Sequence, residues 1–140
     1  MNVTTALVLV ALAAPLAVAD PQTELKPDPA AAAKGAVVYV RYCVSCHGKA
    51  ARGDGPLAAD LQVPVPDMTT LAARNRGHFP EERVQRIIQN GELLRGHGTP
   101  DMPAWGDAFK KTGGTGASTP QEAIRNLTQY LWSLQRPAGR

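Results

Sequence analysis

The chain has 140 residues, with 15 Lys and Arg against 12 Asp and Glu, and a formal net charge of +3. This length suits one domain, and the charges form no run, which favours a solvated surface over a nucleic-acid-binding patch. Aromatic residues make up only 5%, while prolines and glycines number 12 and 13. We therefore expect a domain with much loop that needs an additional source of core.

The first 19 residues read as a signal peptide. No charged side chain precedes Asp20, and the apolar run ends in Ala17-Val18-Ala19, an A-x-A cleavage pattern. We expect export, cleavage after Ala19 and no stable membrane insertion of the mature chain. The alternative is a retained membrane anchor, since a run of about 17 residues is at the short limit for spanning a bilayer.

Helix signals begin after an extended, proline-rich N-terminal arm at residues 20–28. Asp28 followed by Pro29 is an N-cap with proline at the first helical position, and the helix continues through "AAAAKGAVVYVRYC". Residues 49–78 carry many glycines and prolines and read as loop, with one short helical turn at 57–61.

Two further helices follow. The stretch "FPEERVQRIIQNGE" is expected to open at Pro80 and close at Gly91, with one apolar face formed by Val84, Ile87 and Ile88. After a flexible loop at 113–118, Thr119 and Glu122 have the spacing of a capping box. They precede an apolar stripe at helical spacing: Ile124, Leu127, Leu131 and Leu134. Since no segment alternates like a strand, the fold class is predicted to be all-α.

Both cysteines of the chain lie in the pentapeptide Cys43-Val44-Ser45-Cys46-His47. A zinc site would need about four ligands, and a thioredoxin-like pair would need alternating strands and helices around it. C-x-x-C-H is instead the attachment signature of c-type haem. Residues i and i+3 share a helical face, so both thiols can reach two vinyl groups on one porphyrin edge. The pattern predicts one haem c, covalently bound through Cys43 and Cys46, with its iron held by His47.

With these residues the chain resembles a class I c-type cytochrome of the small bacterial periplasmic, monohaem type. The resemblance implies a cytochrome c fold over residues 29–136, with three to five helices around one covalently attached haem, a flexible tail at 137–140 and a periplasmic location. Gly35 and Tyr39 match the family's crossing point between the first and last helices. The expected partner surface on the last helix is Leu127, Tyr130 and Leu131.

The resemblance also implies the sixth ligand of the iron. The stretch "GHGTPDMPAWG" is similar to the family's second-ligand loop and points to Met102. His97, five residues earlier, stays open as an alternative if the loop shifts. Met68 is expected in the core, and His78 is expected to be exposed.

Other haem contacts follow from the same resemblance. The carbonyl of Pro66, with Pro64 as the alternative, is expected to accept a hydrogen bond from the second ring nitrogen of His47. Trp105 is expected to pack on the haem edge or to donate its indole hydrogen to a propionate, with plain packing as the alternative. Candidates for pairing with the propionates are Arg74, Arg76 and Arg95.

A haem with His and Met ligands has no open site for substrate, which implies outer-sphere electron transfer and no enzyme activity. The predicted function is a periplasmic carrier of one electron between a membrane or soluble donor and an acceptor, with redox proteins docking at the haem edge and no nucleic acid bound. Alternatives are a cytochrome subunit of a dehydrogenase or oxidase complex and, less favoured, a peroxidase-like enzyme. The protein is expected to be a monomer or a complex subunit.

Overall fold

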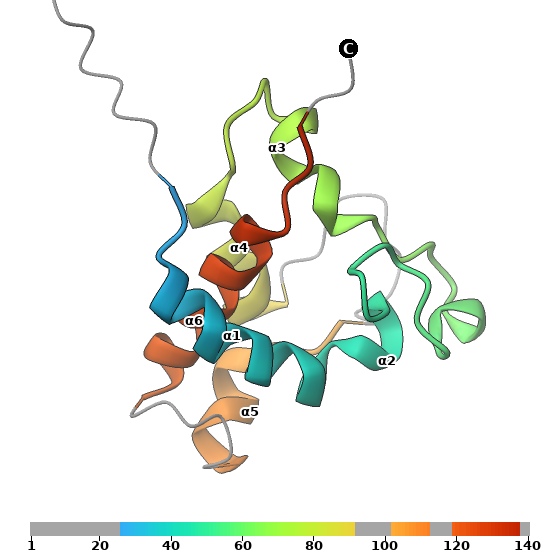
Figure 1. Ribbon diagram of the computed structural model, residues 1–140. Coiled ribbons are helices and arrows are strands. Elements are labelled where there is room, and N and C mark those ends of the chain that lie inside the picture. The colour runs from blue at the N-terminus through green and yellow to red at the C-terminus, as the bar shows by residue number, and fades with distance from the viewer. Residues whose placement is uncertain (1–25, 92–101, 113–118, 138–140) are drawn as a thin grey trace, which may run out of the picture.

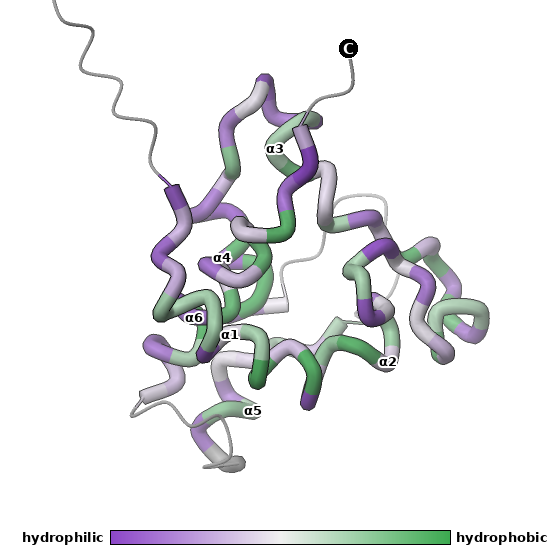
Figure 2. Tube along the Cα trace, in the orientation of Figure 1, coloured by the Kyte–Doolittle hydropathy of each residue, from purple (hydrophilic) through white to green (hydrophobic). Residues whose placement is uncertain are grey.

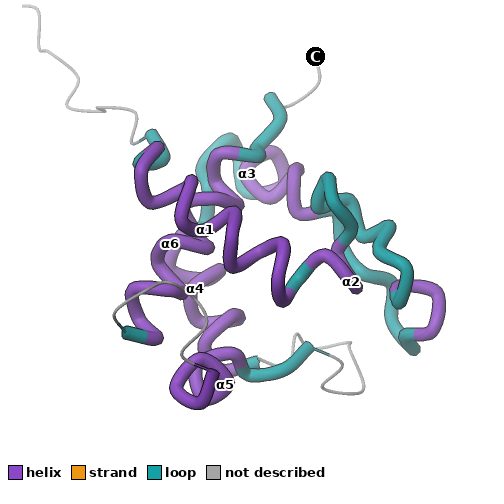
Figure 3. The backbone as a smooth tube through the Cα atoms, turned by 60° about the horizontal axis from the view of Figure 1, so that its bottom comes forward, coloured by secondary structure: helices purple, strands orange, loops and turns teal. Residues whose placement is uncertain are grey.

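A computed structural model describes residues 26–91, 102–112 and 119–137. Its helices are α1 (Pro29–Tyr42), α2 (Val44–His47), α3 (Leu71–Arg74), α4 (Glu81–Asn90), α5 (Trp105–Thr112) and α6 (Pro120–Ser133), with 3-10 turns η1 (Ala58–Asp60) and η2 (Met68–Thr70). The described ranges contain helices and loops without a strand (Figure 3). The all-α prediction is confirmed. The number of helices exceeds the expected three to five because α2 and α3 are single turns of four residues.

The helix ends follow the signals in the sequence. The Asp28 carboxylate accepts hydrogen bonds from the amides of Ala30 (2.9 Å) and Ala31 (3.2 Å), so α1 starts where the Asp-Pro pair predicts. Helix α4 ends at Gly91, which has φ 58° in the left-handed region that glycine adopts without strain. The Thr119 hydroxyl accepts from the Glu122 amide at 3.1 Å and caps α6.

The first and last long helices pack across each other (Figure 1). Their closest approach is at Gly35, where an added Cβ would lie 2.9 Å from the Leu127 amide nitrogen and closer still to the Asn126 carbonyl. Beside it, the rings of Tyr39 and Tyr130 are 5.2 Å apart, centre to centre. The crossing point predicted from the family resemblance is therefore confirmed.

The core lies along this crossing and extends under α4 and α5. Val38, Tyr39 and Leu127 are each only 1% exposed, and burying such side chains contributes roughly 1.5–3 kcal/mol apiece. Helix α4 adds Val84 and Ile88, and α5 adds Phe109. The hydropathy colouring shows apolar residues continuing along α1 into α2 (Figure 2). This apolar path leads from the core to the cysteine pair.

Two helical segments were not predicted from the sequence. Helix α5 begins three residues after Met102, and residues 68–74 form η2 and α3 inside the predicted loop of residues 49–78. The turn expected at 57–61 is present as η1. For α5 a signal existed, because Trp105 and Phe109 are four residues apart and stack with ring centres at 5.7 Å. Short helices of this kind depend on packing more than on local propensity.

The part of the chain that the structure describes contains no helix with the length and apolar character needed to cross a membrane. The N-terminal segment expected as a signal peptide, the loop at 113–118 and the tail after 137 lie outside the described residues. Of the predicted N-terminal arm, residues 26–28 are described, and they are non-helical.

Candidate haem site

A cavity of about 480 Å³ lies beside the cysteine pair. Its volume is within the range of about 300–1,000 Å³ typical of cofactor and ligand sites. Its walls come from α1 and α2, the loop before α3, helix α4, the segment around Met102, and α6. Most of the lining is apolar, including Leu61, Val63, Val65, Leu71, Val84, Ile87, Ile88, Leu127 and Leu131. Ile87, expected on the core face of its helix, contributes to this lining.

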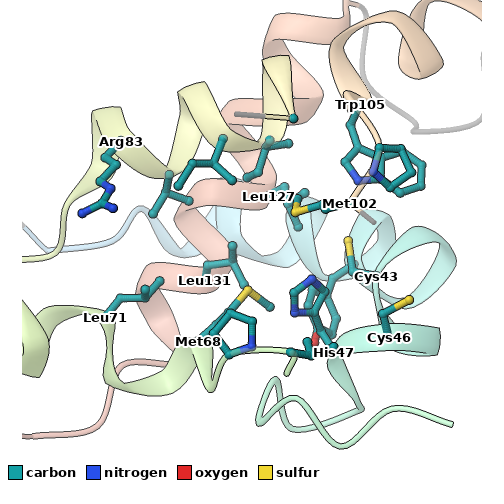
Figure 4. Close-up of a pocket in the computed structure, with 18 of the residues that line it drawn as sticks. Cys43, Cys46, His47, Met68, Leu71, Arg83, Met102, Trp105, Leu127 and Leu131 are labelled. Carbon is teal, nitrogen blue, oxygen red and sulfur yellow. The ribbon is translucent and has the colours of Figure 1, made fainter. Parts of the chain in front are cut away.

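The cysteine pair is set by the turn that links α1 to α2. The Cys43 carbonyl accepts from the amides of Cys46 (3.2 Å) and His47 (2.9 Å), which curls the chain so that both sulfurs lie at one end of the cavity (Figure 4). Both thiols are free. Burial, and then the neighbouring Cys46, raise the pKa of the Cys43 thiol to about 12. Cys43 is therefore held as a neutral thiol inside the cavity.

His47 presents its imidazole to the same cavity. Burial lowers the pKa of this side chain, which keeps the ring neutral near pH 7 with one nitrogen lone pair free for a metal. The Nδ1 atom of His47 is buried without a hydrogen-bond partner. The bond expected from the carbonyl of Pro66 or Pro64 is thus not formed in this structure, although both prolines line the cavity. It stays a prediction for the haem-bound protein.

Tyr39 connects α1 to the turn that contains His47 through a hydrogen bond. Its hydroxyl donates to the carbonyl of Gly48 at 2.7 Å, in a fully buried position one residue after His47. Burial is the main cause that raises the pKa of this phenol, so it remains a donor throughout the physiological range. The bond restrains the end of α2 and, with it, the backbone from which His47 projects.

Met102 lies across the cavity from His47, whereas Met68 lies on the histidine's own side (Figure 4). Both methionines are partly buried and pack against the core. Met68 therefore lies in the core as expected, and it lines the cavity as well. Trp105 also lines the cavity and packs on Tyr42 at 5.5 Å between ring centres. The residues predicted as the main haem contacts all line this one cavity: Cys43, Cys46, His47, Pro66, Met102 and Trp105.

The other candidates named from the sequence differ in where they lie. His78 and Arg76 are exposed and do not line the cavity. His97 and Arg95 lie outside the described residues. Arg74 lines the cavity, but its guanidinium also donates to the Asp67 carbonyl at 2.8 Å.

The wall that carries Met68 is held by two residues that follow α6, Gln135 and Arg136, which we call the C-terminal clip. Gln135 donates to the Met68 carbonyl at 2.8 Å and accepts from the Ala72 amide at 2.9 Å. Arg136 donates through its backbone amide to the Thr69 carbonyl (2.9 Å) and through its guanidinium to the Asp67 carboxylate (2.8 Å). A hydrogen bond from the Thr69 hydroxyl is the main cause that lowers the pKa of Asp67.

Sequence reasoning missed three features of the site. The hydrogen bonds of the C-terminal clip join residues more than 60 positions apart, and no local sequence pattern predicts them. Arg83 lines the cavity at the end away from the cysteines (Figure 4), on the helix whose apolar face had been recognised. Tyr42 also lines the cavity, and its place three residues after Tyr39 on α1 was a usable signal.

These residues fit the haem that the pentapeptide implies. Two thiols lie at one end, a neutral imidazole projects inward, and the walls are mostly apolar. A buried, unpaired polar atom costs about 1–3 kcal/mol. Among the described residues, His47 Nδ1 and the Tyr42 hydroxyl are such atoms, and both residues line this cavity. The donor set of imidazole nitrogen with methionine sulfur is one that haem iron accepts.

Comparison with known proteins agrees with this chemistry. The model of a family described as cytochrome C oxidase, cbb3-type, subunit III matches residues 30–131. A solved chain of a reducing HAO-like protein complex from Kuenenia stuttgartiensis is similar at a TM-score of 0.58 and 25% identity. The similarity covers 89% of this chain and 53% of that one, so this chain spans about half its length. No curated protein matches the sequence. Because the family match covers most of the chain, including the whole cysteine pentapeptide, the chain belongs to this cytochrome family and is a class I c-type cytochrome.

Proposed function

We propose that this protein is an exported, periplasmic carrier of single electrons. Cys43 and Cys46 would hold one haem c through thioether bonds, and His47 and Met102 would supply the ligands of its iron. The observation that carries the proposal is the cavity itself, with two thiols at one end and His47 and Met102 on opposite sides (Figure 4). The bound iron would supply one-electron redox chemistry between its ferrous and ferric states.

The residues around the haem would set its reduction potential. Methionine sulfur is a soft ligand and favours ferrous iron relative to a second imidazole. The apolar walls exclude water and disfavour the additional charge of the ferric state. Cys43 and Cys46 would supply the two thiols for the covalent attachment of the haem. Together these residues favour a fairly positive reduction potential.

Docking of a redox partner is proposed at the cysteine end of the cavity. Cys46 is partly exposed there, and the Leu57 amide donates to the Ser45 carbonyl at 2.9 Å. The exposed side chain of Leu57 therefore lies near the attachment edge, with Lys49 and Arg52 exposed on the same loop. Lys110 is exposed as well, although it is paired with Asp107 at 2.8 Å. The net charge of +3 falls to about +1 once two propionates are counted (3 − 2), so steering by charge should be modest.

A second candidate function is that of a cytochrome subunit within a larger redox complex. The matching family is described as an oxidase subunit, and the similar solved chain comes from a protein complex. The haem chemistry is the same in both cases, and only the partners differ. Co-purification of stoichiometric larger subunits from the native organism would favour the subunit role. A peroxidase-like role would instead require the methionine to leave the iron.

Two measurements test the proposal. Haem should stay with the polypeptide on a denaturing gel stained for peroxidase activity, and Cys43→Ala with Cys46→Ala should abolish the stain. The ferric protein should show the weak sulfur-to-iron charge-transfer band at the red end of the visible spectrum. Met102→Ala should remove that band, lower the reduction potential and allow cyanide to bind.

Met68→Ala is the matched control, since it removes a thioether of equal size from the His47 side of the same cavity. It should keep the band and cost only packing stability, about 2–5 kcal/mol at most. Loss of the band in Met68→Ala with its retention in Met102→Ala would refute the ligand assignment. Rapid binding of carbon monoxide to the ferrous wild type would mean an open site and would favour the enzymatic alternative.

A further inference from the structure

Gln135 follows the end of α6, and its partly buried side chain makes three hydrogen bonds to backbone groups. Its amide nitrogen donates to the carbonyls of Met68 (2.8 Å) and Leu131 (2.7 Å). Its amide oxygen accepts from the Ala72 amide at 2.9 Å. Met68 and Leu131 line the haem cavity, and so does Leu71, the residue before Ala72 (Figure 4). One side chain that does not itself line the cavity therefore holds three segments of its wall together.

Arg136 restrains the neighbouring part of the same wall. Its guanidinium donates to the Thr69 hydroxyl and to the Asp67 carboxylate, both at 2.8 Å. The same carboxylate accepts from the amide (2.8 Å) and the hydroxyl (2.6 Å) of Thr69. Thr69 is only 5% exposed, so its bonds are largely shielded from water. Since Asp67 directly follows the cavity-lining Pro66, the C-terminal clip restrains the wall along residues 66–72.

This wall has little regular structure of its own. It consists of loop, the 3-10 turn η2 and the four-residue helix α3, and such short elements depend on packing with distant parts of the chain. Movement of the wall would admit water to the cavity on the side of His47. Water favours the more highly charged state, which for the haem iron is the ferric state.

We propose that the C-terminal clip raises the reduction potential of the haem by holding this wall closed against water. The inference rests on the proposed binding of one redox-active haem c and deepens it by naming residues outside the cavity that tune it. Gln135 and Arg136 are positioning residues, because they act through the wall and touch neither the haem nor its ligands. With the clip broken, the same ligands would hold the iron, but its potential would be lower.

Gln135→Leu in the haem-loaded protein tests the inference, because leucine has a similar volume and makes none of the three hydrogen bonds. Loss of a direct partner of a metal ligand typically costs about 10–100-fold. The clip acts one layer further out, so the ratio of reduced to oxidised protein at a fixed electrode potential should fall roughly three- to tenfold. The Met68 amide donates to the Ala51 carbonyl at 2.8 Å and not to the clip. It should nevertheless exchange with deuterium faster in the variant, because the wall opens.

Gln129→Leu is the matched control, with the same substitution earlier on α6. Gln129 accepts from the Asp28 amide and donates to the Glu81 carboxylate, both at 2.8 Å, and none of these three residues lines the cavity. This variant should lose stability while the ratio and the Met68 exchange stay at their wild-type values. Arg136→Lys is a second, milder test. Lysine keeps the positive charge but lacks the planar fork that bonds Thr69 and Asp67 together, so the ratio should fall in the same direction by a smaller factor.

Each failure has a distinct signature. If Gln135→Leu keeps the wild-type ratio and Met68 exchange, the inference is overturned while the haem attachment stands. A loss of thermal stability without a change in ratio, as in Gln129→Leu, would make the clip purely structural and also overturns it. If Gln135→Leu does not fold, Arg136→Lys decides, and an unchanged ratio in that variant refutes the inference. If the wild type retains no haem on a denaturing gel, the proposed function fails first.

Discussion

Gly35→Ala tests the packing that holds the haem cavity together. Alanine in a helix is favoured over glycine by about 1 kcal/mol, so helix propensity alone predicts a gain in stability. The added Cβ, however, would lie 2.5 Å from the Asn126 carbonyl carbon and 2.9 Å from the Leu127 nitrogen. Comfortable contacts between carbon atoms need about 3.5–4.0 Å, so α6 must withdraw by roughly 1 Å. Since these atoms belong to a backbone, no side-chain rotation relieves the clash.

That withdrawal loosens the contacts of Val38, Tyr39 and Leu127 at the centre of the core. Overpacking of this kind costs about 1–3 kcal/mol and occasionally more, which outweighs the propensity gain. We expect a net loss of about 2 kcal/mol and a fall in melting temperature of about 10 °C, measured on the haem-loaded protein by far-ultraviolet circular dichroism. Ala33→Gly, on the exposed face of the same helix, isolates the propensity effect at about 1 kcal/mol. A melting temperature for Gly35→Ala equal to or above wild type would refute the tight crossing.

Two other outcomes follow from the site. The pKa of Asp67 is lowered in the folded protein, so its ionised carboxylate stabilises the fold above the ordinary aspartate value of about 3.9, and this stability is lost as pH falls through the lowered value. Asp67→Asn should therefore be less stable than wild type at pH 7 in chemical denaturation, and a difference that persisted unchanged at strongly acidic pH would contradict this origin. The haem-free chain should show weak helical circular dichroism without a cooperative melt, because the side chains that line a cavity of about 480 Å³ would lack packing partners. A cooperative melt would mean that the helices form a stable core without the haem.

Features that depend on a few neighbouring residues could be predicted from the sequence. Asp28 with Pro29, and Thr119 with Glu122, specify helix starts because capping bonds span only two or three residues. Gly91 specifies a helix end for the same reason. The cysteine pentapeptide is equally local, since one turn of backbone brings both thiols to the same end of the cavity. The hydrogen bonds that form these features join residues close in the sequence, so a short sequence pattern is enough to predict them.

Features that depend on distant partners could not be predicted in this way. The Trp105–Phe109 spacing was a signal for helix α5 itself, but not for its packing on Tyr42, which joins segments more than 60 positions apart. The C-terminal clip is similar, because Gln135 bonds the Met68 carbonyl and the Ala72 amide without any sequence signature. Almost every residue has the same backbone carbonyl and amide, so the sequence does not show which of them a side chain will bond. Only the path of the chain shows which of them a glutamine side chain can reach.

The buried polar atoms that lack partners lead to the same site by an independent route. In the described part of the chain there are two such side-chain atoms, His47 Nδ1 and the Tyr42 hydroxyl, and both belong to residues that line the cavity. Folded proteins satisfy nearly all buried polar groups, so unpaired ones mark places where the sequence serves something other than the stability of the bare chain. The C-terminal clip, by contrast, pairs with protein groups: the Gln135 amide bonds the Met68 carbonyl and the Ala72 amide, and the Arg136 guanidinium bonds the Thr69 hydroxyl. Both residues line the cavity beside the cysteine pair, so the unpaired atoms and the cysteine motif point to the same place in the fold.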